Sequence, residues 1–402
     1  MRLRKFDPQS LFLSVLHLAT STNREGYEFA LQKTWENQNK NPYRTPVRSS
    51  LSEARGKVSF KFFKEIYEGD LKRQHKSRRM YRGFYVYAVD GTDLELPATQ
   101  DVISEGYRGS AWNKELETYY PRMYTVHAYD VVNEVVRDFK FSNRKYELRM
   151  ALDMVKDFER NSIAIYDRLY CGYTLIAAHK RAKNYFLVRA RAYDATAPKP
   201  VKTFLASNKR EMETHWYQRL NLGLGPGEGI KVRLIKIRNP RTKEDSVFVT
   251  NLPKDQFTAE ELSALYRRRW EVETSFRDLT STFKMGQWHS KKMNGILQEI
   301  YALLWFVNAV KMQMNRLKTE SVDLLETKYT KAKFKLCAAL VLQNIALLIR
   351  KQIKQLVEKL DLWIRRTRER RERLGRNYPR VTHASAQTYP LANQVRRRPK
   401  LP

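Results

Sequence analysis

Hydrophobic positions follow two different rhythms along the chain, which predicts a protein of both helices and strands. Short uninterrupted apolar runs at 85–89 (YVYAV) and 162–166 (SIAIY) consist largely of β-prone residues and predict buried central strands. Over 123–141 the pattern predicts a hairpin with its turn at 131–133. Apolar residues at helical spacing predict a helix over 146–159. Strands and helices that alternate in this order predict an α/β domain.

Further apolar patterns lie towards the two ends of the chain. Leu11, Val15 and Leu18 share one helical face, which favours an amphipathic helix over a signal peptide. The stretches 296–310 and 334–349 are too short and too polar for membrane spans, and they predict core helices. We therefore expect helical regions on both sides of the α/β domain, and no membrane partner.

A second β-rich stretch precedes the longest predicted helix. Residues 185–253 alternate in pattern and are interrupted by Gly and Pro. Thr258 and Glu261 then form a capping box, which predicts the start of a helix that continues over 258–284.

The net charge of the chain predicts a polyanionic partner. Lys and Arg total 76 against 43 Asp and Glu, a formal net charge of +33, and an excess of this size indicates nucleic acid. Residues 365–402 contain twelve Lys or Arg and two Glu, and we expect this tail to be disordered without nucleic acid. Trp216 is a candidate for stacking on a flipped base, with an ordinary place in the core or on the surface as the alternative.

Cysteine and histidine usage excludes two classes of protein. Cys171 and Cys337 are the only cysteines, so there is neither a disulfide framework nor a zinc motif, as suits a reducing cytoplasm. The seven His residues form no HxH or HExxH pair, which argues against a zinc enzyme.

Both predicted central strands end in an aspartate. Asp90 follows 85–89 and Asp167 follows 162–166, and Gly91 is expected to end the first strand. Where strands run side by side their ends can meet, and sites in α/β proteins lie at the carboxyl ends of strands. Ordinary turn chemistry is the alternative for each aspartate.

The helix predicted over 258–284 carries a third acid. Arg269, Glu273 and Arg277 follow Tyr266 at spacings of 3, 7 and 11 residues, so all four share one helical face. An exposed stripe of ion pairs would show the same spacing. Combined with the two strand-end aspartates, however, Glu273 completes an oxygen-ligand set suited to two Mg²⁺ ions.

The segments around these acids resemble the DDE transposases of bacterial insertion sequences, which have an RNase H-like catalytic fold and a Y-x2-R-x3-E-x6-K signature. AVDGTDLELP resembles the block of the first acid, IAIYDRLYCGY that of the second, and VFVTNLP followed by YRRRWEVETSFRDL that of the third. The similarity extends over roughly residues 45–310. It implies an α/β fold in which an RNase H-like mixed sheet is flanked by helices, with a β-rich insertion before the third catalytic acid.

The resemblance also implies roles for individual residues. Asp90, Asp167 and Glu273 would be the catalytic, metal-binding acids, serving two Mg²⁺ ions for which Mn²⁺ is able to substitute. Tyr266 and Arg269 would bind DNA phosphates beside them.

The chain departs from the signature at its lysine, because position 280 holds Thr280. Lys284 is a candidate replacement, since at about 100° per residue it returns to nearly the helical face of Glu273. Arg277 is the competing candidate for the same DNA contact.

The implied activity is cut-and-paste DNA transposition. Metal-dependent cleavage at the transposon ends would be followed by strand transfer into target DNA. The implied partners are the terminal inverted repeats, the target DNA and a second copy of the chain in a synaptic complex, and the implied place is the bacterial cytoplasm at the nucleoid. Two alternatives stay open: a catalytically inactive DNA-binding relic, favoured by Thr280, and a standalone nuclease of the same fold.

Six regions are expected along the chain. They are a helical DNA-binding region (1–80), the first part of the RNase H-like domain (81–184), the β-rich insertion (185–253), the catalytic helix that completes the domain (254–290), a C-terminal helical region (291–364) and the basic tail (365–402).

Overall fold

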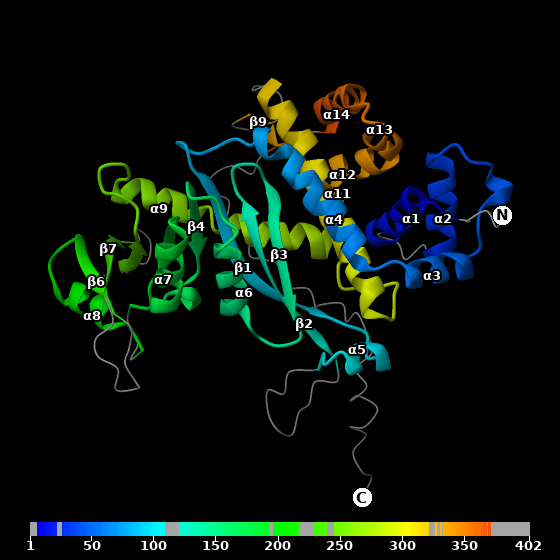
Figure 1. Cartoon of the computed structure of the whole chain (residues 1–402). Helices are drawn as coiled ribbons and strands as arrows, with labels where there is room; N and C mark the ends of the chain where they lie inside the picture. Colours follow the sequence, from blue (N-terminus) through cyan, green and yellow to red (C-terminus); the bar gives the residue numbers. More distant parts are fainter. Residues whose placement is uncertain are drawn as a thin grey trace, which may run out of the picture. The chain divides into compact units, whose positions relative to one another are not determined.

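The structure is a computed structural model, and its elements are drawn in Figure 1. It describes residues 6–21, 26–108, 120–192, 196–217, 229–238, 245–320, 326–327, 330–331, 333–367 and 369–370. The chain divides into two compact units, one of Arg78–Thr92 and Tyr124–Phe276, the other of Met1–Ser77, Asp93–Met123 and Arg277–Pro402. Each unit is described by itself. The limits of the six expected regions stay predictions.

An eight-stranded mixed sheet is the centre of the first unit. Its strands are β1 (Tyr85–Glu95), β2 (Arg122–Asp130), β3 (Val135–Ser142), β4 (Ser162–Tyr166), β5 (Tyr185–Arg189), β6 (Glu211–Trp216), β7 (Ile230–Arg238) and β8 (Asp245–Thr250). They lie in the order β3-β2-β1-β4-β5-β8-β7-β6. With helices on the sheet, this order confirms the predicted α/β class.

The parallel strands lie in the middle of the sheet. β1 pairs with β4, and β4 with β5, both in parallel, whereas β8 joins β5 in antiparallel. The predicted hairpin is present as β2 and β3. Strands β6 to β8 of the β-rich stretch extend the same sheet rather than forming one of their own.

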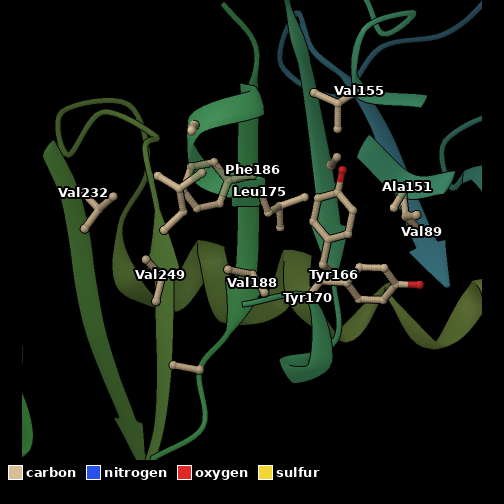
Figure 2. Close-up of a cluster of buried hydrophobic side chains, with 14 of the residues drawn as sticks. Val89, Ala151, Val155, Tyr166, Tyr170, Leu175, Phe186, Val188, Val232 and Val249 are labelled. Atoms are coloured by element: carbon tan, nitrogen blue, oxygen red, sulfur yellow. The ribbon is translucent and has the colours of Figure 1, made fainter. Parts of the chain in front are cut away.

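Helices bury the apolar faces of this sheet. They are α6 (Glu147–Val155), α7 (Tyr173–Ala182), α8 (Lys199–Ala206), α9 (Ala259–Arg267) and α10 (Trp270–Arg277). The core cluster takes alternate residues of β1 together with the apolar face of α6 and residues of α7 and α8. Figure 2 shows part of this cluster, including Val89, Ala151 and Tyr166. Because β1 and β4 are buried on both faces, their apolar runs are uninterrupted, as the sequence indicated.

The long helix predicted over 258–284 is wrong in its continuity. Thr258 and Glu261 do form the capping box, but α9 ends at Arg267 and α10 begins at Trp270. Between them Arg269 N–H bonds to the carbonyl of Tyr266, three residues back, at 2.9 Å, and this tighter turn interrupts the α-helix. A π-helical turn, Asp278–Thr282, follows α10.

The second unit is mainly helical, with a small sheet of the strands β9 (Glu326–Thr327), β10 (Thr330–Lys331) and β11 (Glu369–Arg370). Its helices are α1 (Pro8–Thr20), α2 (Gly26–Asn37), α3 (Arg48–Lys57), α4 (Phe60–Gln74), α5 (Gln100–Ser104), α11 (Met293–Glu320), α12 (Phe334–Gln343), α13 (Ile345–Ile349) and α14 (Ile353–Thr367). Phe12 on α1 lies edge-on to Trp305 on α11, with ring centroids 5.1 Å apart. Arg55 on α3 forms a buried ion pair of 2.7 Å with Glu299 on α11. Helices from both ends of the chain therefore share one core.

The described part of the chain contains no helix that combines the length and the apolar character needed to cross a membrane.

Candidate active site at the ends of two parallel strands

The two strand-end aspartates lie side by side. Val89 of β1 is paired with Tyr166 of β4 in parallel register, so the next residue on each strand is Asp90 and Asp167. The charge of Asp167 influences the ionisation of Asp90, as expected of neighbouring carboxylates. The predicted meeting of these two strand ends is confirmed.

Arg269 connects the first acid to the third. Its Nη1 donates to Oδ2 of Asp90 at 3.2 Å, and its Nη2 donates to Oε1 of Glu273 at 2.9 Å. The Arg269 side chain is only 8% exposed, whereas those of Asp90 and Glu273 are 20% and 36% exposed. The turn between α9 and α10 carries this arginine, which here contacts carboxylates where the resemblance implied phosphates.

Burial disfavours the ionised form of Asp90. Removal from water raises the pKa of Asp90 to about 6, against the opposing effects of the Gly91 N–H and the Arg269 charge. The negative charges of Glu147 and Asp167 add to the rise. A bound cation would favour the ionised form, because opposite charge stabilises a carboxylate.

Tyr266 lies at the same site. It is 9% exposed, and its ring packs against Phe248 with centroids 4.7 Å apart. Burial raises the pKa of Tyr266 to about 12, with Arg269 opposing and Asp167 adding to the rise. The tyrosine is therefore a neutral hydroxyl at neutral pH, near both Arg269 and the second acid.

Glu147 belongs to the same group of acids, although its sequence position gave little sign of it. Its carboxyl group lies against Gly91: a Cβ added to that glycine would stand 2.7 Å from Glu147 Cδ. The prediction that Gly91 ends β1 is wrong, since the strand continues to Glu95. Glycine is needed there for the close approach of a side chain rather than for a turn. The only sequence signal was an acid at the start of a helix, which ordinarily indicates favourable contact with the helix dipole.

Trp216 is not available to a DNA base. It is 4% exposed at the end of β6, opposite Ile230 of β7, and belongs to the hydrophobic core cluster. A stacked base needs an exposed ring face, and the ring of Trp216 is covered by core residues. The alternative interpretation, an ordinary place in the core, is therefore the one observed, and the candidate role in base stacking is contradicted.

The continuous helical spacing from Glu273 that favoured Lys284 is not present in the structure. Lys284 lies beyond the π-helical turn, in the left-handed region with φ of 55°, so a helical wheel drawn from Glu273 does not reach it. Arg277 is the exposed last residue of α10. A DNA contact by either residue stays a prediction, and most of the basic tail, from residue 371 onward, lies outside the described residues.

The donor chemistry of this site suits a hard divalent cation. Carboxylate oxygens are the protein ligands that Mg²⁺ prefers. Within the described ranges, no hydrogen bond or ion pair engages the side chain of Asp167. No three Asp, Glu, His or Cys side chains there stand in a metal-binding arrangement, and Arg269 takes the place between Asp90 and Glu273. The ligand types fit Mg²⁺, provided that Arg269 no longer bonds to Asp90 and Glu273 when the ion is bound.

The chain matches one known protein family. Residues 81–309, more than half of the 402, match the family model described as "Transposase DDE domain", and this range includes every acid named above. No curated protein matches the chain. Among solved structures the chain is similar to a piggyBac transposase, in a synaptic complex with hairpin DNA, at 10% identity and a TM-score of 0.46, over 88% of this chain and 75% of that one.

Proposed function

This chain belongs to the family of transposase DDE domains, and we propose that Asp90, Asp167 and Glu273 are the three acids with which it cleaves DNA. A DNA transposase must break phosphodiester bonds at the ends of its element and join the ends to target DNA. Two strand-end aspartates in parallel register, linked through Arg269 to a helical glutamate, are the observation that carries the assignment.

The proposed cofactor is a pair of Mg²⁺ ions, with Mn²⁺ as a substitute. When bound, such ions stabilise the charge on the attacking and leaving oxygens of a phosphoryl transfer. Asp90 and Asp167 would hold them at the strand ends, and Glu273 would approach from α10. No covalent protein nucleophile is needed for either hydrolysis or strand transfer.

Arg269 then has two partners in succession. Without metal it neutralises Asp90 and Glu273, and its Nε is buried without a hydrogen-bond partner among the described residues. Cation binding to the same carboxylates would compete with the guanidinium, which would be released towards DNA phosphate. Arginine suits that task, because its planar fork binds phosphate oxygens in pairs.

The partners we propose are the terminal inverted repeats, target DNA and a second copy of the chain. The net charge of +33 supports the DNA partners, since affinity for duplex DNA comes chiefly from Lys and Arg contacts with phosphates.

Asp167→Asn tests the assignment. It keeps the size of the side chain but removes a proposed metal ligand, so nicking of end DNA in Mg²⁺ should fall by about a thousandfold or more. Gel-shift affinity for the same DNA should stay within about twofold, because it depends on basic residues. The matched control is Asp153→Asn, an exposed acid of α6 paired with Lys156.

Nicking by Asp167→Asn at the rate of Asp153→Asn would refute the assignment. Wild-type protein that binds end DNA but does not nick it in Mg²⁺ or Mn²⁺ would instead support the inactive relic.

A further inference from the structure

We propose that Glu147 is a positioning residue of this active site, which ties together the two strand ends and adds the negative charge that strengthens their hold on a divalent cation. The inference rests on the proposed function, because it presumes a metal at Asp90 and Asp167.

The contact with Gly91 comes first. Glu147 is the first residue of α6, and its N-cap neighbour Tyr146 makes no side-chain capping hydrogen bond. Its carboxyl group lies so close to Gly91 that a Cβ there would stand 2.7 to 2.9 Å from its Cδ, Cγ and Oε1. The φ of Gly91 is not in the left-handed region, so space for Glu147 explains the glycine. Glu147 thereby packs on the residue that follows Asp90.

The contact with Tyr170 comes from the other strand end. The Tyr170 hydroxyl donates to Oε1 of Glu147 at 2.5 Å. Tyr170 is 3% exposed, packs on Tyr166 with ring centroids 5.4 Å apart (Figure 2), and closes the turn that Asp167 opens, since its N–H bonds to the Asp167 carbonyl at 3.1 Å. One carboxylate therefore links the backbone after Asp90 to the turn after Asp167.

The charge of Glu147 is what a purely structural role leaves unexplained. A glutamine has the same shape and accepts the same hydrogen bond from Tyr170. A carboxylate instead repels the carboxylate of Asp90, because it lies against Gly91, the residue next to that acid. The repulsion becomes an attraction once a divalent cation is bound among these acids, because each extra negative charge then lowers the free energy of the complex. A charged residue at this position is favourable only in the metal-bound site.

The experiment is a calorimetric titration of Mn²⁺ into the full-length chain without DNA. Glu147→Gln should weaken Mn²⁺ binding by about tenfold, while Asp153→Asn on the same helix should leave it unchanged. Tyr170→Phe keeps the charge and loses only the restraint, so its affinity should lie between those of wild type and Glu147→Gln. Thermal unfolding in EDTA, read on the same samples, should show Glu147→Gln at least as stable as wild type.

A second variant covers a failure of Glu147→Gln to fold. Gly91→Ala places a methyl group where the Glu147 carboxyl lies, and that flexible side chain can move aside without shifting backbone. Mn²⁺ affinity should fall as it does in Glu147→Gln.

Asp167→Asn separates the two levels of the proposal. If Asp167→Asn loses Mn²⁺ affinity but Glu147→Gln and Gly91→Ala bind like wild type, the role of Glu147 is refuted and the proposed function stands. If Asp167→Asn itself binds like wild type, the proposed function fails and the role of Glu147 fails with it.

Discussion

The sheet carries a cluster of acids and one arginine at each end of the same two strands, and the two clusters are built differently. Where β1 and β4 begin, Arg78 contacts Asp130 at 2.6 Å and Glu159 at 2.9 Å, and Tyr87 donates to Glu159 at 2.5 Å. Asp130 is also bonded by the N–H groups of Val132 and Asn133 at 3.1 and 3.0 Å. Every acid in this first cluster has several donors.

The second cluster, where the paired run of β1 and β4 ends, leaves its acids short of partners. The guanidinium of Arg269 donates one hydrogen bond to Asp90 and one to Glu273. Among the described residues, Asp90 is bonded by only one further donor, the Gly91 N–H at 2.9 Å. Glu147 and Asp167 add charge of the same sign. Buried charges that are fully paired indicate a structural role, whereas buried acids that lack counter-charge indicate a site for a cation.

The pKa values of one acid from each cluster, Glu159 and Asp90, are shifted in opposite directions. Burial works against ionisation of Glu159, but hydrogen bonds from Tyr87 and the backbone and the charge of Arg78 outweigh it and lower the pKa of Glu159. At Asp90 burial prevails and the pKa rises to about 6. We infer that the first cluster serves the fold, whereas in the second the ionised form of Asp90 lowers the stability of the metal-free chain.

The largest difference between the clusters should appear when each loses its arginine. Arg78→Met leaves Asp130, whose side chain is 0% exposed, without its counter-charge and should reduce the free energy of unfolding by about 3–5 kcal/mol. Arg269→Met releases two acids that reach solvent and should cost only about 1 kcal/mol, while nicking falls by about a hundredfold. Urea unfolding in EDTA and a nicking assay measure the two effects.

Equal losses of stability in Arg78→Met and Arg269→Met would contradict the distinction between a structural and a functional cluster.

Divalent metal should act on one cluster alone. At a Mn²⁺ concentration about a hundred times the dissociation constant, binding to the folded chain should add about 2.7 kcal/mol to the free energy of unfolding. Asp90→Asn should abolish this increment. Asp130→Asn should lower the baseline stability but retain the increment, and its loss there would place the metal at the wrong end of the strands.

Asp90→Asn should itself stabilise the metal-free protein. Because the folded-state pKa of Asp90 is raised from 3.8 to about 6, the buried carboxylate lowers stability above pH 6 and this cost disappears as the pH falls towards 3.8. In EDTA at pH 8 the variant should be more stable than wild type by about 2 kcal/mol, and at pH 4.5 by less than about 1 kcal/mol. Glu159→Gln should behave oppositely, with its loss of stability greatest at high pH.

The smallest effect on either cluster should come from the basic tail. Deleting residues 371–402 should change the free energy of unfolding by less than about 0.5 kcal/mol. Its effect should lie in DNA binding, where the slope of log K against log salt should become shallower by about 0.9 for each lost phosphate contact. An unchanged slope of log K against log salt would show that the tail does not contact DNA phosphates.

Much of this architecture was predictable because strand patterns report burial directly. The runs ending at Asp90 and Asp167 predicted both strands, and the rule that sites lie at strand ends predicted their meeting. Glu147 was not predictable, because its role depends on where α6 begins relative to Gly91, a contact between residues 56 positions apart in sequence.

The errors have equally local causes. Lys284 was placed by assuming that the helix continues beyond Glu273, and the π-helical turn after Arg277 breaks that assumption. Trp216 was open to two interpretations because the sequence does not report which face of an edge strand such as β6 is covered. The side chain lies on the covered face.

Iron-directed cleavage of the chain tests the central claim most directly. Fe²⁺ would replace Mg²⁺ in the full-length protein, and the hydroxyl radicals it generates with ascorbate and peroxide cut the backbone near the metal. We expect three cuts, near residues 90, 167 and 273, which Asp167→Asn removes and Asp130→Asn keeps. Cuts near residues 78, 130 and 159, or near only one of the three acids, would contradict the claim.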